Sequence, residues 1–167
     1  MNIKWLAHIP TIEGKGRPRF GNGRTYTPKA TRAYEKTVGA LCRIARGSDA
    51  MVDGGCVLVV VILDPIPMTW SRKDGSPNAK AIRATMQNEP SRKRPDVDNC
   101  LKAITDGAQG VWFKDDGGVL PIPWRGWAPS PRSEGVHIAC IEAPTPREKL
   151  AVLAGVPDFV RDLLEQA

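Results

Sequence analysis

Apolar and polar residues alternate with a period of two in two segments, one at the start of the chain and one before residue 144. Residues 3–10, IKWLAHIP, predict a first strand, and residues 135–143, GVHIACIEA, predict a closing strand. Between them, residues 56–63, CVLVVVIL, form a nearly continuous apolar run that stops at Asp64. Such a run is typical of a central strand that is buried on both faces.

Apolar residues repeat with helical spacing in three further segments. Residues 29–47 present one apolar face and end at Gly47, which predicts a helix with a glycine stop. A short helix is predicted at residues 79–86 within a long polar connection. Another is predicted at residues 99–110, with Asp98 as its N-cap.

The remaining segments have weaker patterns. Residues 21–24, GNGR, indicate a hairpin turn in a basic loop. Residues 95–98 are predicted to be extended, and residues 111–113, VWF, to form a strand that leads into a turn. The Pro- and Trp-rich residues 119–134 are predicted to be irregular. Residues 144–167 predict one or two amphipathic helices behind a Pro-Thr-Pro hinge.

Strands that alternate with helices predict a mixed α/β (α+β) fold, a small mixed β-sheet flanked by helices. A length of 167 residues suits one domain. We assign residues 1–143 to this domain and residues 144–167 to a C-terminal helical tail, either an appendage or a dimer arm. No apolar run approaches the roughly 20 residues of a membrane helix, and the start has no signal-peptide pattern, so we expect a cytoplasmic protein.

The positive charge of the chain, +6 in total, is concentrated near its start. Residues 14–46 hold nine lysines and arginines against a single acid, Glu35, whereas from Glu134 onward six acids face three bases. This asymmetry favours a polyanion-binding surface, although counting alone is also compatible with a plain solvated exterior.

The metal-binding chemistry open to the chain is narrow. Its four cysteines lie far apart in apolar settings, which predicts buried core residues rather than disulfides or zinc ligands. With only His8 and His137, a site built on histidine is not expected. Any metal would have to be held by carboxylates, which favours Mg²⁺ or Mn²⁺.

Residues 94–116, RPDVDNCLKAITDGAQGVWFKDD, concentrate five aspartates in this basic chain. If the DVD segment is extended, Asp96 and Asp98 project to the same face, because side chains alternate along a strand. On the helix that follows, the i, i+4 rule places Asp98, Lys102 and Asp106 on one stripe. With a further acid from the DD pair, these residues would suit a Mg²⁺ site that acts on a phosphodiester, with Lys102 beside the phosphate.

Plain structural roles fit the same residues. Asp98 alone is an ordinary N-cap, Asp106 an ordinary ion-pair partner of Lys102, and KDDGG an ordinary turn. The DxD pattern is common, so spacing alone leaves both interpretations open.

The order of motifs across the whole segment resembles the core of the RusA-type Holliday junction resolvases. Their pattern begins with a basic residue, in many members a following proline, and then Asp-x-Asp-Asn. A helix with Lys and Asp and a strand that ends in Asp-Asp come next. Residues 14–35, GKGRPRFGNGRTYTPKATRAYE, also resemble the basic N-terminal loop and first helix of that family. The resemblance covers most of residues 1–143. It departs from the pattern at Gly117 and Gly118 and in the unusual segment PIPWRGWAPSPRSE.

The resemblance implies roles for single residues. The residues that match the catalytic positions are Asp96, Asp98, Asp116 and Lys102. The three aspartates match the carboxylates that hold the metal, Mg²⁺ with Mn²⁺ as an alternative. Asn99 and Asp106 match motif positions whose simplest roles are to start the helix and to pair with the lysine, and Asp115 is a weaker candidate for a metal contact.

The resemblance also implies an assembly and an activity. The expected protein is a RusA-like, intertwined homodimer that acts as a Mg²⁺-dependent endodeoxyribonuclease in DNA recombination and repair. It would resolve four-way junctions by paired symmetric nicks that leave a 5′-phosphate. A homodimer with one active site per subunit matches the two-fold symmetry of a junction.

Basic residues on both sides of the acids would hold the DNA backbone without reading its sequence, in a salt-dependent way. These are Lys15, Arg17, Arg19, Arg24, Arg92, Lys93 and Arg94. Arg94 would alternatively neutralise the acid cluster. Tyr26 and Trp70 would suit stacking on bases, although packing is the simpler role for both and for Trp112.

Three other functions stay open. The first is a metal-dependent nuclease for other branched DNA, such as flaps or forks, which a panel of branched substrates would separate. The second is a branched-DNA-binding protein without catalysis. The third is a structural or partner-binding protein dominated by the tail from Pro144, which truncation after Ala143 would test.

Overall fold

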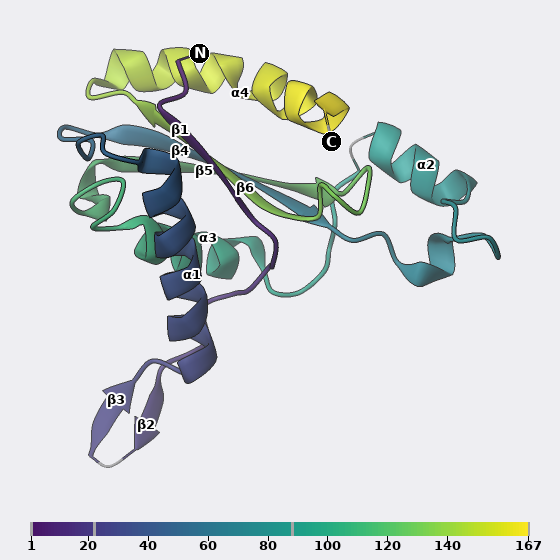
Figure 1. The fold of residues 1–167 in the computed structure, drawn as a ribbon, viewed down its shortest axis with the longest axis horizontal. Coiled ribbons are helices and arrows are strands. Elements are labelled where there is room, and N and C mark those ends of the chain that lie inside the picture. Colours follow the sequence, from purple (N-terminus) through teal and green to yellow (C-terminus); the bar gives the residue numbers. More distant parts are fainter. Residues whose placement is uncertain (1, 22, 88, 167) are drawn as a thin grey trace.

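A mixed β-sheet of four strands lies at the centre of the computed structural model, which describes residues 2–21, 23–87 and 89–166 (Figure 1). The strand order is β1 (Trp5–Ile9), β6 (Gly135–Glu142), β4 (Cys56–Asp64) and β5 (Val119–Trp127). β6 runs antiparallel to both β1 and β4, whereas β5 runs parallel to β4. Helices flank this sheet, so the predicted mixed α+β class is confirmed.

The composition of β4 explains its central position. All nine of its residues are buried. Leu58, Val60 and Ile62 pack into a core cluster on one side of the sheet, while the alternate valines, such as Val57 and Val59, pack into a second cluster on the other side. A strand needs apolar residues at every position when both of its faces are covered.

β5 corrects the prediction that residues 119–134 are irregular, since residues 119–127 form a regular strand. The two prolines that argued against a strand, Pro121 and Pro123, are two residues apart and so point their missing N–H positions to the same side. β5 is an edge strand, and only one of its sides needs backbone donors. The edge position therefore tolerates both prolines.

The helices α1 (Lys29–Arg46) and α3 (Val97–Ala108) cover one face of the sheet (Figure 1). They approach each other closely at two glycines. A Cβ on Gly107 would lie 2.6 Å from the Cβ of Val38, and a Cβ on Gly39 would lie 2.9 Å from the Gly107 carbonyl oxygen. The small residues let the helix that carries the aspartates pack directly on α1, and α1 ends at the predicted glycine.

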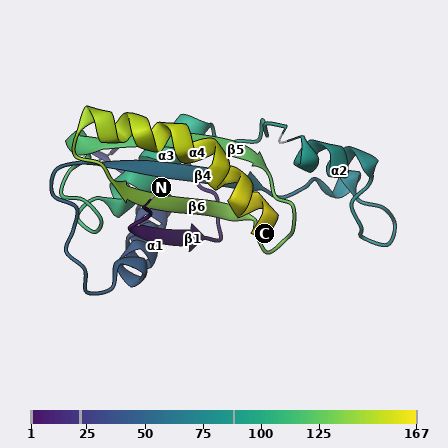
Figure 2. The same ribbon diagram turned by 90° about the horizontal axis from the view of Figure 1, so that it is seen from above.

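The opposite face of the sheet is covered by α4 (Pro146–Gln166), which crosses it in both ribbon views (Figures 1 and 2). Its apolar residues pack on the second core cluster, and Val160 is only 5% exposed. The tail is one helix that contains Pro157, where one or two helices were predicted. In this structure α4 is therefore a layer of the fold.

Two segments project from this layered body, as Figure 1 shows for both and Figure 2 for the second. The hairpin of β2 (Arg19–Gly21) and β3 (Arg24–Tyr26) precedes α1 and confirms the predicted turn, of which Asn22 lies outside the described residues. The connection after β4 contains a 3₁₀ turn, η1 (Met68–Trp70), and α2 (Ala79–Met86), which matches the predicted short helix.

The cysteines and Trp112 behave as the sequence predicts. All four thiols are free and buried. Trp112 is fully buried, and its indole N–H donates to the Cys42 carbonyl over 2.7 Å. Among the described residues no helix is long and apolar enough to cross a membrane.

Candidate active site

The start of α3 determines the directions of the first two aspartates. The helix begins at Val97, and Asp96 occupies the N-cap position with an extended backbone, φ −63° and ψ 152°. The predictions that residues 95–98 are extended and that Asp98 is the N-cap are therefore wrong. The physical reason is that aspartate is favoured both at the N-cap and in the first helical turn, so a DVD segment can start a helix at either residue. Helical geometry, and not strand alternation, sets the directions of Asp96 and Asp98.

Asp96 does not cap the helix that it precedes. Its carboxylate accepts no hydrogen bond from the first turn of α3. Within the described residues, Asp96, Asp98 and Asp116 are all exposed, and none of their carboxylates has a hydrogen-bond or ion-pair partner. These three side chains are therefore available to an external ligand.

A cleft of about 290 Å³ brings two of the three predicted carboxylates together with the predicted lysine. Asp98, Lys102 and Asp116 all line it. The stripe expected from helical spacing is confirmed, because Asp98, Lys102 and Asp106 lie on the same side of α3 and border this cleft. Its apolar border is formed by Leu101, Val119 and Pro121.

Asp116 reaches the cleft from a turn and not from a strand end. The predicted strand at residues 111–113 is wrong, since these residues form a turn in which Phe113 makes only isolated bridges. Three apolar residues do not distinguish a strand from a buried turn, and here burial of Trp112 holds the turn against the core. Asp116 then opens the 3₁₀ turn η2 (Asp116–Gly118), which leads into β5.

Asp115 has a local structural bond. Its carboxylate oxygen Oδ1 accepts from the Gly117 N–H over 3.0 Å and so caps η2. That bond turns Asp115 towards its own loop, whereas Asp116, the second residue of the pair, lines the cleft.

Asp106 pairs with a different lysine from the one predicted. Its carboxylate bonds to the ammonium of Lys15, which also lies 3.9 Å from Glu35. The expected pairing with Lys102 is therefore replaced by a contact between segments that are far apart in the sequence. Helical spacing identifies which residues share a stripe, but it cannot reveal a partner that approaches from another loop.

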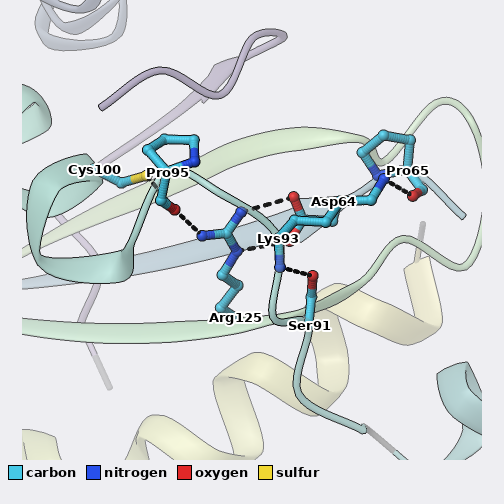
Figure 3. A network of polar contacts seen from close by, with 7 residues as sticks. All are labelled: Asp64, Pro65, Ser91, Lys93, Pro95, Cys100 and Arg125. Atoms are coloured by element: carbon cyan, nitrogen blue, oxygen red, sulfur yellow. Dashed lines mark hydrogen bonds and ion pairs between the residues drawn. The ribbon is translucent and has the colours of Figure 1, made fainter. Parts of the chain in front are cut away.

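Two charged residues beside the site were missed in the sequence. Asp64, at the end of β4, and Arg125, in β5, form a buried ion pair (Figure 3). The same guanidinium donates to the carbonyl of Pro95, the residue before Asp96. Hydrogen bonds to Asp64 raise the pKa of Arg125, so this cation stays charged. Charged residues inside two apolar segments were the available signal, because Arg125 is the only charge between residues 117 and 131.

The basic residues of the hairpin are exposed. Arg17, Arg19 and Arg24 extend along the projecting segment, and Phe20 and Tyr26 are 77% and 44% exposed. Within the described residues, none of the three arginines forms an ion pair with an acid. The hairpin therefore presents unneutralised positive charge and aromatic surface.

The basic residues that precede Asp96 differ from one another. Arg92 and Arg94 are exposed, and in the described part of the chain Arg94 has no ion pair that neutralises the aspartates. The ammonium of Lys93 instead donates to the Pro65 carbonyl over 2.6 Å and lies 5.4 Å from the Trp127 ring. The Trp127 ring in turn packs against Trp70.

Comparison with known proteins gives one result. The model of the endodeoxyribonuclease RusA family matches residues 10–136. The chain belongs to the RusA family. No curated protein and no solved structure matches it. The matched residues include the hairpin, α3, η2 and β5, and α4 lies beyond them.

Membership of the RusA family indicates a DNA endonuclease of the kind that resolves Holliday junctions, and the cleft has the donor chemistry that a RusA enzyme would use. Carboxylates are the ligands that Mg²⁺ and Mn²⁺ prefer. In the described residues, no three His, Cys, Asp or Glu side chains are already close enough to form a metal site. Asp98 and Asp116 line the cleft, whereas Asp96, the N-cap residue two positions before Asp98, is not among its lining residues. The donors fit a divalent cation that keeps several water ligands.

Proposed function

We propose that this chain is a Mg²⁺-dependent endodeoxyribonuclease that resolves four-way DNA junctions by paired symmetric nicks, in DNA recombination and repair. The observation that carries the proposal is the cleft shared by Asp98, Lys102 and Asp116, in a chain of the RusA family. Mn²⁺ would substitute for Mg²⁺, because it accepts the same oxygen ligands.

The carboxylates are the proposed metal ligands. Asp98 from α3 and Asp116 from η2 would hold the cation from two sides of the cleft, and Asp96 would provide a third carboxylate. A bound divalent cation supplies activation of water and neutralisation of charge on the phosphate. The three side chains have no partner to give up in the described structure, so binding a cation breaks no existing ion pair.

Lys102 would act on the phosphate. It lies one helical turn after Asp98, lines the same cleft, and its ammonium forms no ion pair among the described residues. A fixed cation beside the scissile phosphate stabilises the negative charge that develops during cleavage. The products would carry a 5′-phosphate and a 3′-hydroxyl.

The basic surfaces would hold the DNA. Arg17, Arg19 and Arg24 on the hairpin offer free charge, and Arg92 and Arg94, shortly before Asp96 in the chain, are also exposed. Such contacts bind phosphates, orient the duplex and weaken steeply with salt. Lys15 and Lys93 would contribute less, because each ammonium already has a partner in the protein.

A homodimer is part of the proposal. A four-way junction has two-fold symmetry, and its resolution takes two matching nicks. Two copies of the chain related by a two-fold axis would place one cleft at each cleavage position.

The decisive experiment is a Mg²⁺-dependent cleavage assay that compares a four-way junction with a linear duplex, a flap and a fork. We expect paired nicks in the junction alone, at symmetric positions and sealable by ligase. Preferential cutting of the flap or fork would make the chain a different branched-DNA nuclease. Binding of the junction without any cleavage would make it a binding protein.

The same assay tests the carboxylates. Asp96→Asn, Asp98→Asn and Asp116→Asn should each abolish cleavage while junction binding persists or tightens, because each removes a negative charge next to DNA. Asp162→Asn, an exposed residue of α4, is the matched control and should cut normally. A wild-type rate in any of the first three variants would remove that residue from the site.

A further inference from the structure

We infer that Arg125, held by Asp64, is a positioning residue that fixes the start of α3 and thereby the carboxylate of Asp96. The inference rests on the proposed function, because it gives Asp96 a place in the metal site. It concerns two residues that lie outside the aspartate motif, one in each of two neighbouring parallel strands.

The pair is buried and has well-defined geometry. The Arg125 Nε donates to Oδ2 of Asp64 over 2.6 Å, and Nη2 donates to Oδ1 over 2.9 Å. Each side chain is only 4% exposed. The two strands are in parallel register, with Arg125 opposite Ile62, so the contact joins β5 to the end of β4 (Figure 3).

The third nitrogen of the guanidinium reaches the segment before α3. Nη1 donates to the carbonyl oxygen of Pro95, the residue that immediately precedes Asp96 (Figure 3). The thiol of Cys100 also donates to this oxygen, over 3.7 Å. All three nitrogens of Arg125 are thus used, two on the sheet and one on the residue before the N-cap.

No hydrogen bond within α3 holds the side chain of Asp96 in place. The chain that leads into α3 belongs to no strand or helix from residue 89 to residue 96 in the described structure. The Asp96 carboxylate makes no capping bond to the helix. Its position therefore depends on contacts of its neighbours, among them the bond from Arg125 to the Pro95 carbonyl. A second contact, from the Lys93 ammonium to the Pro65 carbonyl, ties the same segment to the end of β4.

Stability alone is a weak reason for this arrangement. Two charges buried from water lose much of their hydration, and an apolar pair of similar size is often equally stable. What an apolar pair cannot provide is the directed bond to the Pro95 carbonyl. Arginine presents its donors in a rigid planar fork, which lets one side chain satisfy a carboxylate and a carbonyl together.

The test uses Arg125→Lys, which keeps the positive charge beside Asp64 but loses the planar set of donors that reaches both Asp64 and Pro95. Residues that orient metal ligands typically contribute 10- to 100-fold to affinity or activity, so we expect single-turnover cleavage to fall by about that factor. The Mg²⁺ concentration at half-maximal rate should rise, and the junction Kd should stay within about twofold of wild type, because the hairpin is unchanged. Arg147→Lys, an exposed arginine of α4, is the control.

Amide hydrogen exchange gives a readout that does not need activity. The N–H of Cys100 donates to the Asp96 carbonyl over 3.1 Å, at the first hydrogen-bonded position of α3. In Arg125→Lys this amide should exchange faster than in wild type, while amides in the middle of β4 stay equally protected. If Arg125→Lys does not fold, amide exchange in the wild-type protein still tests the inference. Rapid exchange of the Cys100 amide together with slow exchange in β4 would show that the start of α3 is not anchored, and it would overturn the inference.

The double variant Asp64→Leu/Arg125→Met removes both charges together. If it folds and cuts junctions at the wild-type rate with the wild-type Mg²⁺ requirement, Arg125 is only structural and the inference is wrong. If the wild-type chain cuts no junction, the proposed function fails, and exchange at Cys100 in Arg125→Lys still decides whether Arg125 positions the start of α3.

Discussion

The ammonium of Lys15 bonds to the carboxylate of Asp106, and this ion pair joins the loop before the basic hairpin to the last turn of α3. The same loop makes two further contacts with the start of α3. The Lys15 N–H donates to the Asn99 carbonyl over 2.9 Å, and Gly14 lies so close to Pro95 that a Cβ on Gly14 would be 2.5 Å from the Pro95 Cβ. The loop that leads into the hairpin therefore also contacts the helix that carries the candidate active-site aspartates.

This ion pair predicts that the basic residues contribute unequally to junction binding. Lys15→Ala should weaken junction binding less than Arg19→Ala, because Asp106 already neutralises the lysine. Measured against salt, the logarithm of the affinity should lose about one unit of slope in Arg19→Ala and less in Lys15→Ala. Asp106→Asn should bind at least as well as wild type, since it releases a lysine and removes an acid. Equal loss of slope in both alanine variants would show that Lys15 leaves Asp106 to contact a phosphate.

Replacement of Lys102 should affect the cleavage rate much more than the affinity for DNA. It is exposed in the cleft, so replacing it should cost little stability. Lys102→Ala should slow cleavage of a bound junction by about 10²- to 10³-fold, the range for loss of one charge-stabilising donor. The junction Kd should change by only a small factor, because one contact among several is lost. Single-turnover rates and binding titrations measure the two effects, with Arg147→Ala as control. A loss confined to binding would make Lys102 a phosphate anchor.

Local patterns predicted most elements of this fold because each signal lies within a few residues. The apolar run of β4 and the periodicity of α1 are such signals, and both elements are present. β5 was missed because its two prolines disfavour a strand everywhere except at a sheet edge, and edge position is a property of the whole sheet. The turn at residues 111–113 was missed because a three-residue apolar run has no measurable period.

The same limit applies to the candidate site. Helical spacing placed Asp98 and Lys102 in one cleft, since both lie on α3. The pairing of Asp64 with Arg125 joins residues 61 positions apart, and no local pattern predicts which buried acid meets which buried base. Resemblance to the family motif supplied the aspartates, but it supplied neither the partner of Asp106 nor the contact to Pro95.

Contacts of α4 predict that the tail stabilises the domain. Val160 is 5% exposed and packs on the cluster formed by the outer face of β4. Val160→Ala should lower the free energy of unfolding by about 1.5–3 kcal/mol, through lost burial and the cavity that remains. Leu150→Ala, on the same helix but 67% exposed, should change it by less than about 0.5 kcal/mol. Urea unfolding measures both.

Truncation after Ala143 extends this prediction. Without α4, the second core cluster would face water along the length of β4. We expect the shortened chain to unfold or aggregate, not merely to lose a partner. A truncated protein that is monomeric, as stable as the full chain and active on junctions would show that α4 is dispensable for the fold.

The stacked pair of His8 and His137 predicts a dependence of stability on pH. The rings lie opposite each other on β1 and β6, with centroids 4.4 Å apart. The Nε2 of His137 lies 2.9 Å from the Ser133 carbonyl oxygen, which can only accept, so Nε2 carries the hydrogen. Burial lowers the pKa of His137, the nearby His8 lowers it further, and the bond to Ser133 opposes both.

The sign follows from linkage. The unfolded chain takes up a proton on this histidine near pH 6.5, whereas the folded protein takes it up only at lower pH. The stabilisation is therefore complete above about pH 6.5, the unfolded value, and is lost as the pH falls from there towards the lower pKa of the folded protein. The loss is at most about 1.4 kcal/mol per pH unit for one proton. His137→Gln keeps a neutral donor for the Ser133 carbonyl and should remove this part of the pH dependence. Urea unfolding of both proteins at pH 7.5 and pH 5.5 measures the difference, and an unchanged loss of stability in His137→Gln would assign the effect to other groups.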